Sequence, residues 1–148
     1  MNEFINELSM SYTKKLFSCT MITCSKDAET VAREVFFHTD ADVGVKEYFF
    51  VILLNRANDV IGYHKLSEGG ICSTVVDIRL AFATALKSLA VAMILVHNHP
   101  SGNLKPSHQD LKLTDSFVNA GKLLEIQIFD HVIITPESYY SFADNALM

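Results

Sequence analysis

The sequence LAVAMILVHNHPSG, residues 89–102, predicts the centre of the fold. Its first eight residues, Leu89 to Val96, are all apolar. Such a run is typical of a strand buried on both faces, and it is far shorter than the roughly 20 residues of a membrane-spanning helix. Two histidines and a turn around Pro100 and Gly102 follow the run. We therefore expect a central strand whose carboxyl end carries polar side chains.

Strands and helices alternate along the rest of the chain. Tyr48 to Leu54 is a second apolar run, of seven residues, and Ser25 can cap a helix whose apolar residues recur at helical spacing. This order predicts a mixed sheet covered by helices on both faces. The expected elements are a helix from Ser25, strands at Glu47–Leu54 and Val60–Leu66, a helix at Ile78–Ala90, a strand at Val91–Val96, a helix at Ser107–Leu124 and a strand at Ile126–Ile134.

The composition fits one compact domain. Of the 148 residues, 49% are apolar and 20% are charged, which excludes a disordered or collagen-like protein. Twelve basic and seventeen acidic side chains give a net charge of −5, so the overall charge does not attract nucleic acid or acidic lipid. Residues 1–24 show weak periodicity, and we expect them to form an N-terminal lead-in to a domain spanning residues 25–148.

The cysteines and the N-terminus indicate the compartment. Cys19, Cys24 and Cys72 are scattered without C-x-x-C spacing, which disfavours both a disulfide framework and a thiolate metal site. We expect each of them to be reduced and partly buried. The N-terminus lacks the basic segment and apolar core of a secretory signal. We therefore expect a cytoplasmic protein that does not enter a membrane.

His97 and His99 are candidate metal ligands. Side chains two residues apart on a strand point to the same side, so the two imidazoles would lie together while Asn98 points the other way. The turn after His99 would bring Asp110 back, in the first turn of the next helix, as a carboxylate ligand. Two imidazoles and a carboxylate suit a catalytic zinc ion that keeps one position for water, and they also suit other divalent ions.

A hydrolytic zinc site also needs a base that accepts a proton from the activated water. Glu34, Glu47, Glu68 and Glu125 are all candidates, and their spacing does not choose among them. Ser107 could donate a hydrogen bond to a developing oxyanion.

Structural interpretations compete with these roles. Ser107 and Asp110 form an S-x-x-D pattern, which is typical of a helix cap and explains both residues without a metal ion. Asp130 with His131 is expected to make a strand-end hydrogen bond that closes the sheet. The remaining histidines, expected to be surface or core residues, are His38, His64 and His108.

The segment HNHPSGNLKPSHQDLKLT, residues 97–114, resembles the signature of the RadC-like branch of the JAB/MPN+ (JAMM) metalloprotein superfamily. That signature is HNHPSG, three variable residues, PS, two variable residues, D, three variable residues and T, and every fixed position is filled here. The resemblance extends from about Ser25 onward. Glu47-Tyr48-Phe49 is similar to the family's E-x-F, and the segment from Asp130 is similar to its DH-hydrophobic strand.

The resemblance implies a three-layer α/β/α sandwich related to the cytidine deaminases, with zinc held by His97, His99 and Asp110. It also implies Glu47 as the general base and Ser107 as the oxyanion donor. The chain lacks the H-x-E and P-C-x-x-C residues of the deaminases, which disfavours deamination. In the superfamily this site hydrolyses peptide or isopeptide bonds, including those to ubiquitin-like modifiers. We therefore expect a zinc-dependent hydrolase that acts on a peptide or a protein conjugate.

A metal-stabilised, non-catalytic module in DNA repair or recombination is the alternative, because RadC-like proteins carry a DNA-repair label. Longer RadC proteins begin with a helix-hairpin-helix region that would hold DNA, and residues 1–24 are too short for it. Together with the net charge of −5, this disfavours direct binding of duplex DNA. The exposed edges of a mixed sheet favour a homodimer.

Overall fold

The structure is a computed structural model that describes residues 5–69 and 75–148. Its helices and strands alternate as the apolar pattern predicts, with one additional short strand near the C-terminus. The elements are α1 (Ser25–His38), β1 (Tyr48–Leu54), β2 (Val60–Glu68), α2 (Ile78–Lys87), β3 (Ala92–Asn98), α3 (His108–Leu124), β4 (Gln127–Ile134) and β5 (Tyr139–Ser141).

The strands form one mixed sheet of five strands in the order β2-β1-β3-β4-β5. β3 and β4 are parallel, and the other neighbouring pairs are antiparallel. β1 and β3, the two apolar runs, lie inside the sheet and are buried at every position. In their register Phe49 lies opposite His97, so the start of β1 meets the carboxyl end of β3.

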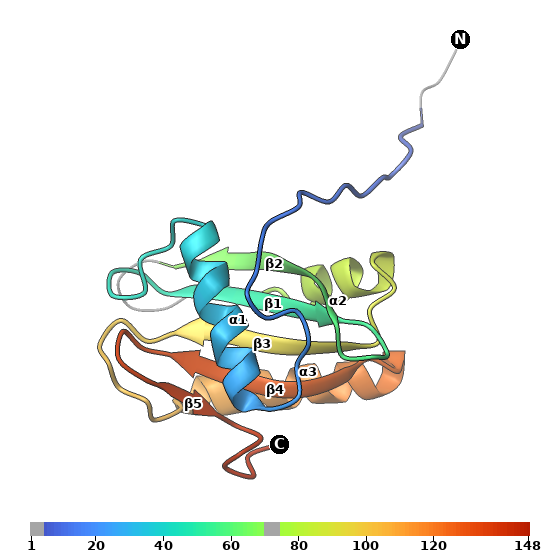
Figure 1. The fold of residues 1–148 in the computed structure, drawn as a ribbon. Coiled ribbons are helices and arrows are strands. Elements are labelled where there is room, and N and C mark those ends of the chain that lie inside the picture. The colour runs from blue at the N-terminus through green and yellow to red at the C-terminus, as the bar shows by residue number, and fades with distance from the viewer. Residues whose placement is uncertain (1–4, 70–74) are drawn as a thin grey trace.

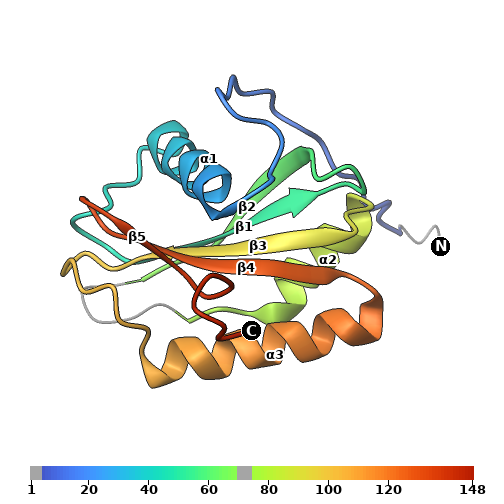
Figure 2. The same ribbon diagram turned by 60° about the horizontal axis from the view of Figure 1, so that its bottom comes forward.

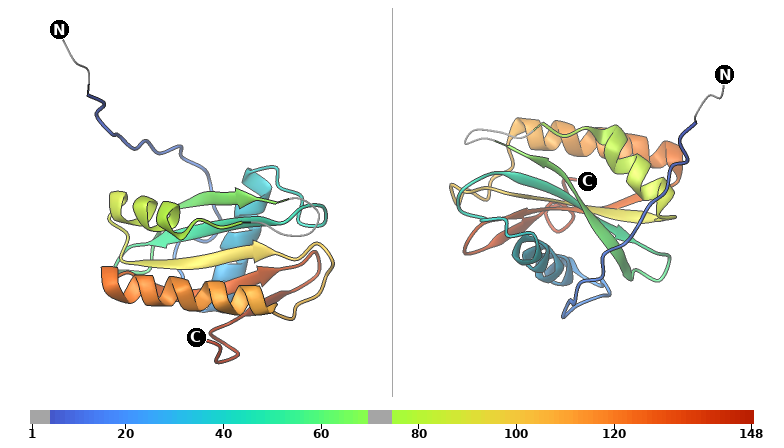
Figure 3. Two further views of the ribbon diagram at one scale, coloured as in Figure 1. Left: turned by 180° about the vertical axis from the view of Figure 1, so that it is seen from behind. Right: turned by 90° about the horizontal axis from the view of Figure 1, so that it is seen from above.

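Helices cover both faces of the sheet. α1 lies on one face, and α2 and α3 lie on the other (Figures 1 and 2). The view from behind has α2 and α3 in front of the strands and α1 beyond them (Figure 3). The predicted three-layer α/β/α sandwich is thereby confirmed.

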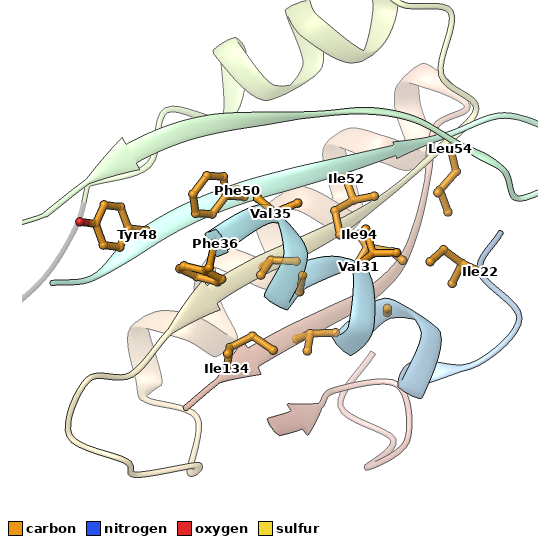
Figure 4. Close-up of a cluster of buried hydrophobic side chains, with 14 of the residues drawn as sticks. Ile22, Val31, Val35, Phe36, Tyr48, Phe50, Ile52, Leu54, Ile94 and Ile134 are labelled. Atoms are coloured by element: carbon orange, nitrogen blue, oxygen red, sulfur yellow. The ribbon is translucent and has the colours of Figure 1, made fainter. Parts of the chain in front are cut away.

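The α1 face is closed by an apolar cluster. Phe36 of α1 packs edge-on against Phe50 of β1, with ring centroids 5.1 Å apart. Val31 and Val35 of α1 lie beside Ile52 and the neighbouring strand residues (Figure 4). Burial of this apolar stripe, rather than helix propensity alone, stabilises α1 on the sheet.

The ends of two helices differ from the sequence prediction. α1 begins at Ser25 itself and Cys24 is its N-cap, so the prediction that Ser25 caps the helix was wrong. Asp27 accepts hydrogen bonds from the N–H groups of Thr23 and Cys24, which supports the chain entering the helix. α2 ends at Lys87 because Leu89 adopts a left-handed conformation with φ of 59°, which stops the helix before the next strand.

Residues 5–20 contain no helix or strand, and Met21 makes an isolated bridge with Asp59. Cys19 is partly buried, but Cys24 is exposed, which contradicts the prediction for that residue; Cys72 lies outside the described residues. None of the helices in the described ranges has the length and apolarity of a membrane span.

Candidate metal centre

The carboxyl end of β3 and the first turn of α3 bring three candidate ligands together. His97, His99 and Asp110 each direct one ligand atom to a common region, and these atoms lie within 4.8 Å of one another. The two Nε2 atoms are 2.9 Å apart. Asp110 Oδ1 lies 3.2 Å from Nε2 of His97, and Oδ2 lies 3.5 Å from Nε2 of His99. The expected convergence of the two imidazoles and the carboxylate is therefore present.

A tight loop returns the chain from β3 to α3. Gly102 has a φ of 79°, which glycine adopts without strain, and its N–H donates to the carbonyl of His99 at 3.1 Å. Ser107 is the N-cap of α3, and both its N–H and its hydroxyl donate to Asp110 Oδ2 at 2.7 Å. The predicted cap is thus present. It also holds the Asp110 carboxylate against the histidines, so the structural and the ligand interpretations are compatible.

The second nitrogen of each imidazole is held from behind. Nδ1 of His99 lies 2.6 Å from the carbonyl of Asn103, to which it can only donate, and Nδ1 of His97 lies 2.7 Å from Nε2 of His131. Histidines that bind metals usually have their second nitrogen fixed in this way. In a neutral His99, the bond to Asn103 leaves the lone pair on Nε2, which faces the other ligands.

The donor set fits a divalent metal ion. A tetrahedral ion with bonds of about 2.0–2.1 Å separates its donor atoms by roughly 3.3 Å. The two Nε2 atoms are 2.9 Å apart, and different oxygens of Asp110 lie 3.2 Å from His97 and 3.5 Å from His99, so that one donor atom from each residue lies within 4.8 Å of the others. Nitrogen and carboxylate oxygen are ligands of zinc and of several other divalent ions. Small side-chain shifts would therefore suffice for His97, His99 and Asp110 to hold such an ion.

Burial and mutual contacts shift the pKa values in this cluster. Burial would raise the pKa of the Asp110 carboxyl, but its contacts with His97 and His99 outweigh burial and hold that pKa well below its usual range. Burial lowers the pKa of His99, while its bonds to Asp110 and Asn103 raise it, and the net shift is upward. Asp110 is therefore a carboxylate, which is the form that binds metals.

Glu47 lies at the same site, immediately before β1. It lines a cavity of about 300 Å³ together with His97, His99, Ser107 and Asp110. Continuing the β1–β3 register by two residues sets Glu47 opposite His99. This placement follows from the pairing of two strands that lie far apart in the sequence.

The other three candidate bases lie elsewhere. Glu34 accepts hydrogen bonds from Ser18 on the α1 side of the sheet. Glu68 pairs with Lys46 and Lys65, and Glu125 ends α3. None of the three lines the cavity that holds the candidate ligands, so Glu47 is the candidate base that the fold brings to the site.

Ser107 lines the cavity, but its hydroxyl proton points to Asp110 Oδ2. A role for Ser107 as an oxyanion donor stays a prediction. Further side chains from four segments complete the cavity wall. They are Phe49, Val76, Ser101, Asn103, Lys105, Gln109 and Leu113.

Asp130 and His131 both attach the C-terminal segment to β4, and the His131 ring makes a further contact with the candidate ligand His97. Asp130 accepts hydrogen bonds from the Ser141 hydroxyl at 2.6 Å and the Ala143 N–H at 3.0 Å, and so attaches the C-terminal segment to β4 as expected. The carbonyl of His131 accepts the N–H of Phe142 at 3.0 Å, which also attaches this segment, while the fully buried His131 ring contacts His97. Burial, followed by the nearby His97, lowers the pKa of His131 well below its ordinary value. The expected strand-end hydrogen bonds are thus present, and the contact of the His131 ring with His97 is an additional feature that was not predicted.

Asn98 is a second residue whose role the sequence analysis missed. Its side chain is fully buried on the side opposite to the histidines. Its Oδ1 accepts the N–H of Tyr48 at 2.7 Å, and its Nδ2 donates to the carbonyls of Lys46 at 2.7 Å and Val43 at 2.8 Å. Asn98 therefore holds the backbone on both sides of Glu47.

Comparison with known proteins shows which family the chain belongs to. The family model for the RadC-like JAB domain matches residues 22–147. A "UPF0758 protein" of Flavobacterium johnsoniae is 44% identical over 126 residues, which cover 85% of this chain and 53% of that protein. A "UPF0758 protein" of Salinibacter ruber is 38% identical over 127 residues, which cover 86% and 52%.

A third relative, a "UPF0758 protein" of Porphyromonas gingivalis, is 43% identical over 104 residues, which cover 70% of this chain and 46% of that protein. The chain thus spans about half the length of the curated relatives that it matches. The family match covers most of the chain, including β3 and α3, which carry the candidate ligands. The chain therefore belongs to the RadC-like JAB domain family.

Proposed function

We propose that the protein is a zinc-dependent hydrolase of the JAMM type that cleaves a peptide or isopeptide amide bond. The observation that carries this proposal is the convergence of His97, His99 and Asp110 beside a cavity that Glu47 also lines. Membership of the RadC-like JAB domain family supports the same chemistry.

A zinc ion held by these ligands would supply a Lewis acid that polarises the scissile carbonyl and lowers the pKa of a coordinated water to about 7. The Glu47 carboxylate then accepts a proton from water and delivers it to the leaving amine. Such acid–base catalysis typically accelerates a reaction roughly 10²- to 10⁴-fold. Ser107 would donate to the developing oxyanion, for which its hydroxyl must leave Asp110 Oδ2.

The substitution Glu47→Gln tests the role of the base. The variant should retain nearly stoichiometric zinc, because no ligand is removed, and should lose hydrolysis of the peptide and isopeptide substrates that the parent cleaves. Glu125→Gln, at the opposite end of α3, is the matched control and should keep both properties. Undiminished hydrolysis by Glu47→Gln would exclude Glu47 as the base.

The substrate and the partners are also proposals, because the chain matches only about half of each relative's length. A peptide or protein conjugate is the substrate class that fits amide hydrolysis, and a homodimer could form through an edge strand such as β2. The same preparation should be titrated with single-stranded and branched DNA at two salt concentrations. Salt-sensitive binding without amide turnover would replace the hydrolase by a non-catalytic module in DNA repair or recombination.

A further inference from the structure

A buried histidine that is not a candidate ligand lies directly behind His97. His131 has no exposed surface. One ring nitrogen, Nε2, lies 2.7 Å from Nδ1 of His97, and the other, Nδ1, lies 2.6 Å from the hydroxyl of Thr114. Thr114 is 1% exposed and lies on α3, one turn after Asp110. Three polar side chains are therefore joined in a buried row that begins at one candidate ligand.

The direction of these hydrogen bonds follows from the far end of the row. The Thr114 hydroxyl lies 2.7 Å from the backbone carbonyl of Asp110, which can only accept, so Thr114 donates its single proton there. Towards His131 the same oxygen must then accept. Nδ1 of His131 consequently carries a proton.

The remaining proton positions follow from the hydrogen-bond geometry. The hydrogen-bonding partners of the His131 ring are a hydroxyl and an imidazole. In the neutral ring a proton on Nδ1 leaves the lone pair on Nε2, which then accepts the Nδ1 proton of His97. A neutral His97 then has its own lone pair on Nε2, the atom that faces His99 and Asp110.

Aromatic side chains hold both rings in this arrangement. Phe49 stacks on His97 with centroids 5.8 Å apart and planes inclined by 9°. Phe142, which follows β5, stacks on His131 with centroids 4.5 Å apart. Rotation of either imidazole would therefore disturb packed rings as well as a hydrogen bond.

We propose that Thr114 and His131 are positioning residues that select the Nδ1–H tautomer of His97 and so present its Nε2 lone pair to the metal ion. The hydrogen bonds run from the backbone carbonyl of Asp110 through Thr114 and His131 to the ring of His97. They therefore link two candidate ligands that come from different elements. The inference rests on the proposed metal site for its purpose, but the tautomer itself is a property of the metal-free protein.

The first test compares Thr114→Val, which removes the hydroxyl at nearly constant volume, with Thr114→Ser, which keeps it. The probe is zinc, and its affinity is measured by competition with a chromophoric chelator. Loss of a partner behind a ligand typically costs about 10- to 100-fold in metal affinity. We expect a loss of that size for Thr114→Val and an affinity close to that of the parent for Thr114→Ser.

A matched control removes a buried hydroxyl elsewhere. Thr135 is 2% exposed, and its hydroxyl donates to the carbonyl of Ser138 and has no part in the row behind His97. Thr135→Val should therefore leave zinc affinity unchanged even if it lowers stability. Equal zinc affinities for the parent and Thr114→Val would overturn the proposal, as would a loss in Thr135→Val as large as that in Thr114→Val.

The second test reads the tautomers directly in the metal-free parent. Long-range ¹H–¹⁵N NMR spectra distinguish a protonated from an unprotonated ring nitrogen. We expect a proton on Nδ1 of both His97 and His131, whereas an unprotonated Nδ1 on His97 would overturn the proposal. This measurement needs no variant, zinc or substrate, so it decides the tautomer even where Thr114→Val does not fold or the hydrolase function fails.

Discussion

Alternate residues of β3 enter two different environments. On the face covered by α1, Ile94 and Val96 belong to an apolar cluster. On the other face, Met93 and Leu95 lie in the apolar cluster beneath α2 and α3, but the next residue in that row, His97, faces the candidate metal centre. The stability of the α1 face depends on how completely its side chains fill the interior, whereas metal binding depends on the positions of a few ligand atoms. Substitutions on the two sides should therefore affect different measurable properties.

His99→Ala should have the largest effect, and that effect should be on metal binding. The substitution removes one of three candidate ligands at the end of β3. If a zinc site of about 10–16 kcal/mol divides its free energy equally among its three protein ligands, the affinity should fall by roughly 10²- to 10⁴-fold. Zinc content after purification without chelator, followed by chelator competition, measures this loss.

A matched control for His99→Ala is His108→Ala, because His108 is exposed at the start of α3 and is not part of the ligand cluster. It should keep the zinc affinity of the parent. The unfolding midpoint of metal-free His99→Ala should stay near that of the parent, since this residue fills no part of the apolar core. A His99→Ala protein that binds zinc as tightly as the parent would remove His99 from the ligand set.

Phe50→Ala should give the opposite result. Phe50 is fully buried on the α1 face, against Phe36, and its loss should leave a cavity and lower the free energy of unfolding by about 3–5 kcal/mol. Urea denaturation of the metal-free protein measures this change. The folded variant should keep its zinc affinity, because the α1 face contributes none of the candidate ligands.

The control for Phe50→Ala is Phe37→Ala, an aromatic truncation on α1 where the side chain is 78% exposed. It should change the free energy of unfolding by less than about 0.5 kcal/mol. If Phe50→Ala released zinc under conditions where the protein is folded, the two faces would not be independent and the comparison would be wrong.

Much of the fold is predictable because its signals are local. The runs that form β1 and β3 are apolar over seven or eight residues, a length that favours a buried strand over a buried helix. β5 was missed because Tyr139–Ser141 is only three residues long and has no periodicity of its own. Its position depends on pairing with Val132 to Ile134 of β4, which is a contact that local patterns do not encode.

The site was predictable where its residues share one segment, and less so where they do not. His97, His99 and Asp110 lie within 14 consecutive residues, so strand alternation and a helix cap sufficed to bring them together. Glu47 could not be distinguished from the other glutamates by spacing, because its approach requires the β1–β3 register. The family resemblance supplied that information.

The contact of the His131 ring with His97 was not predicted, for a physical reason. In β4 the pairing with β3 skips Phe129, so that Ile128 is opposite Met93 but Asp130 is opposite Ile94. An extra residue of this kind reverses the alternation beyond it and re-aims the following side chains. His131 therefore shares the face of Leu95 and reaches His97, a result that strict alternation from Ile128 would not give.

Asn98 does not fit the division between the two faces. Its side chain points away from the candidate ligands, yet it holds the backbone around Glu47. Its three hydrogen bonds hold the backbone from Val43 to Tyr48, with Glu47 between two of the bonded residues. Asn98→Ala leaves the buried N–H of Tyr48 and the partly buried carbonyls of Val43 and Lys46 without this partner, and it should lower the free energy of unfolding by about 2–3 kcal/mol. Because the ligands are untouched, zinc affinity should change little.

The decisive measurement for Asn98→Ala is hydrolysis at full zinc occupancy, since a displaced Glu47 would slow proton transfer without releasing the metal. We expect a lower kcat with nearly unchanged zinc content. Asn145→Ala, which removes one hydrogen bond to the carbonyl of Ser141 in the exposed C-terminal turn, is the control and should alter neither. If Asn98→Ala hydrolysed its substrate at the parent's rate, the hydrogen bonds of Asn98 would stabilise the fold without positioning Glu47. Asn98 would then be a purely structural residue, like the buried side chains of the α1 face.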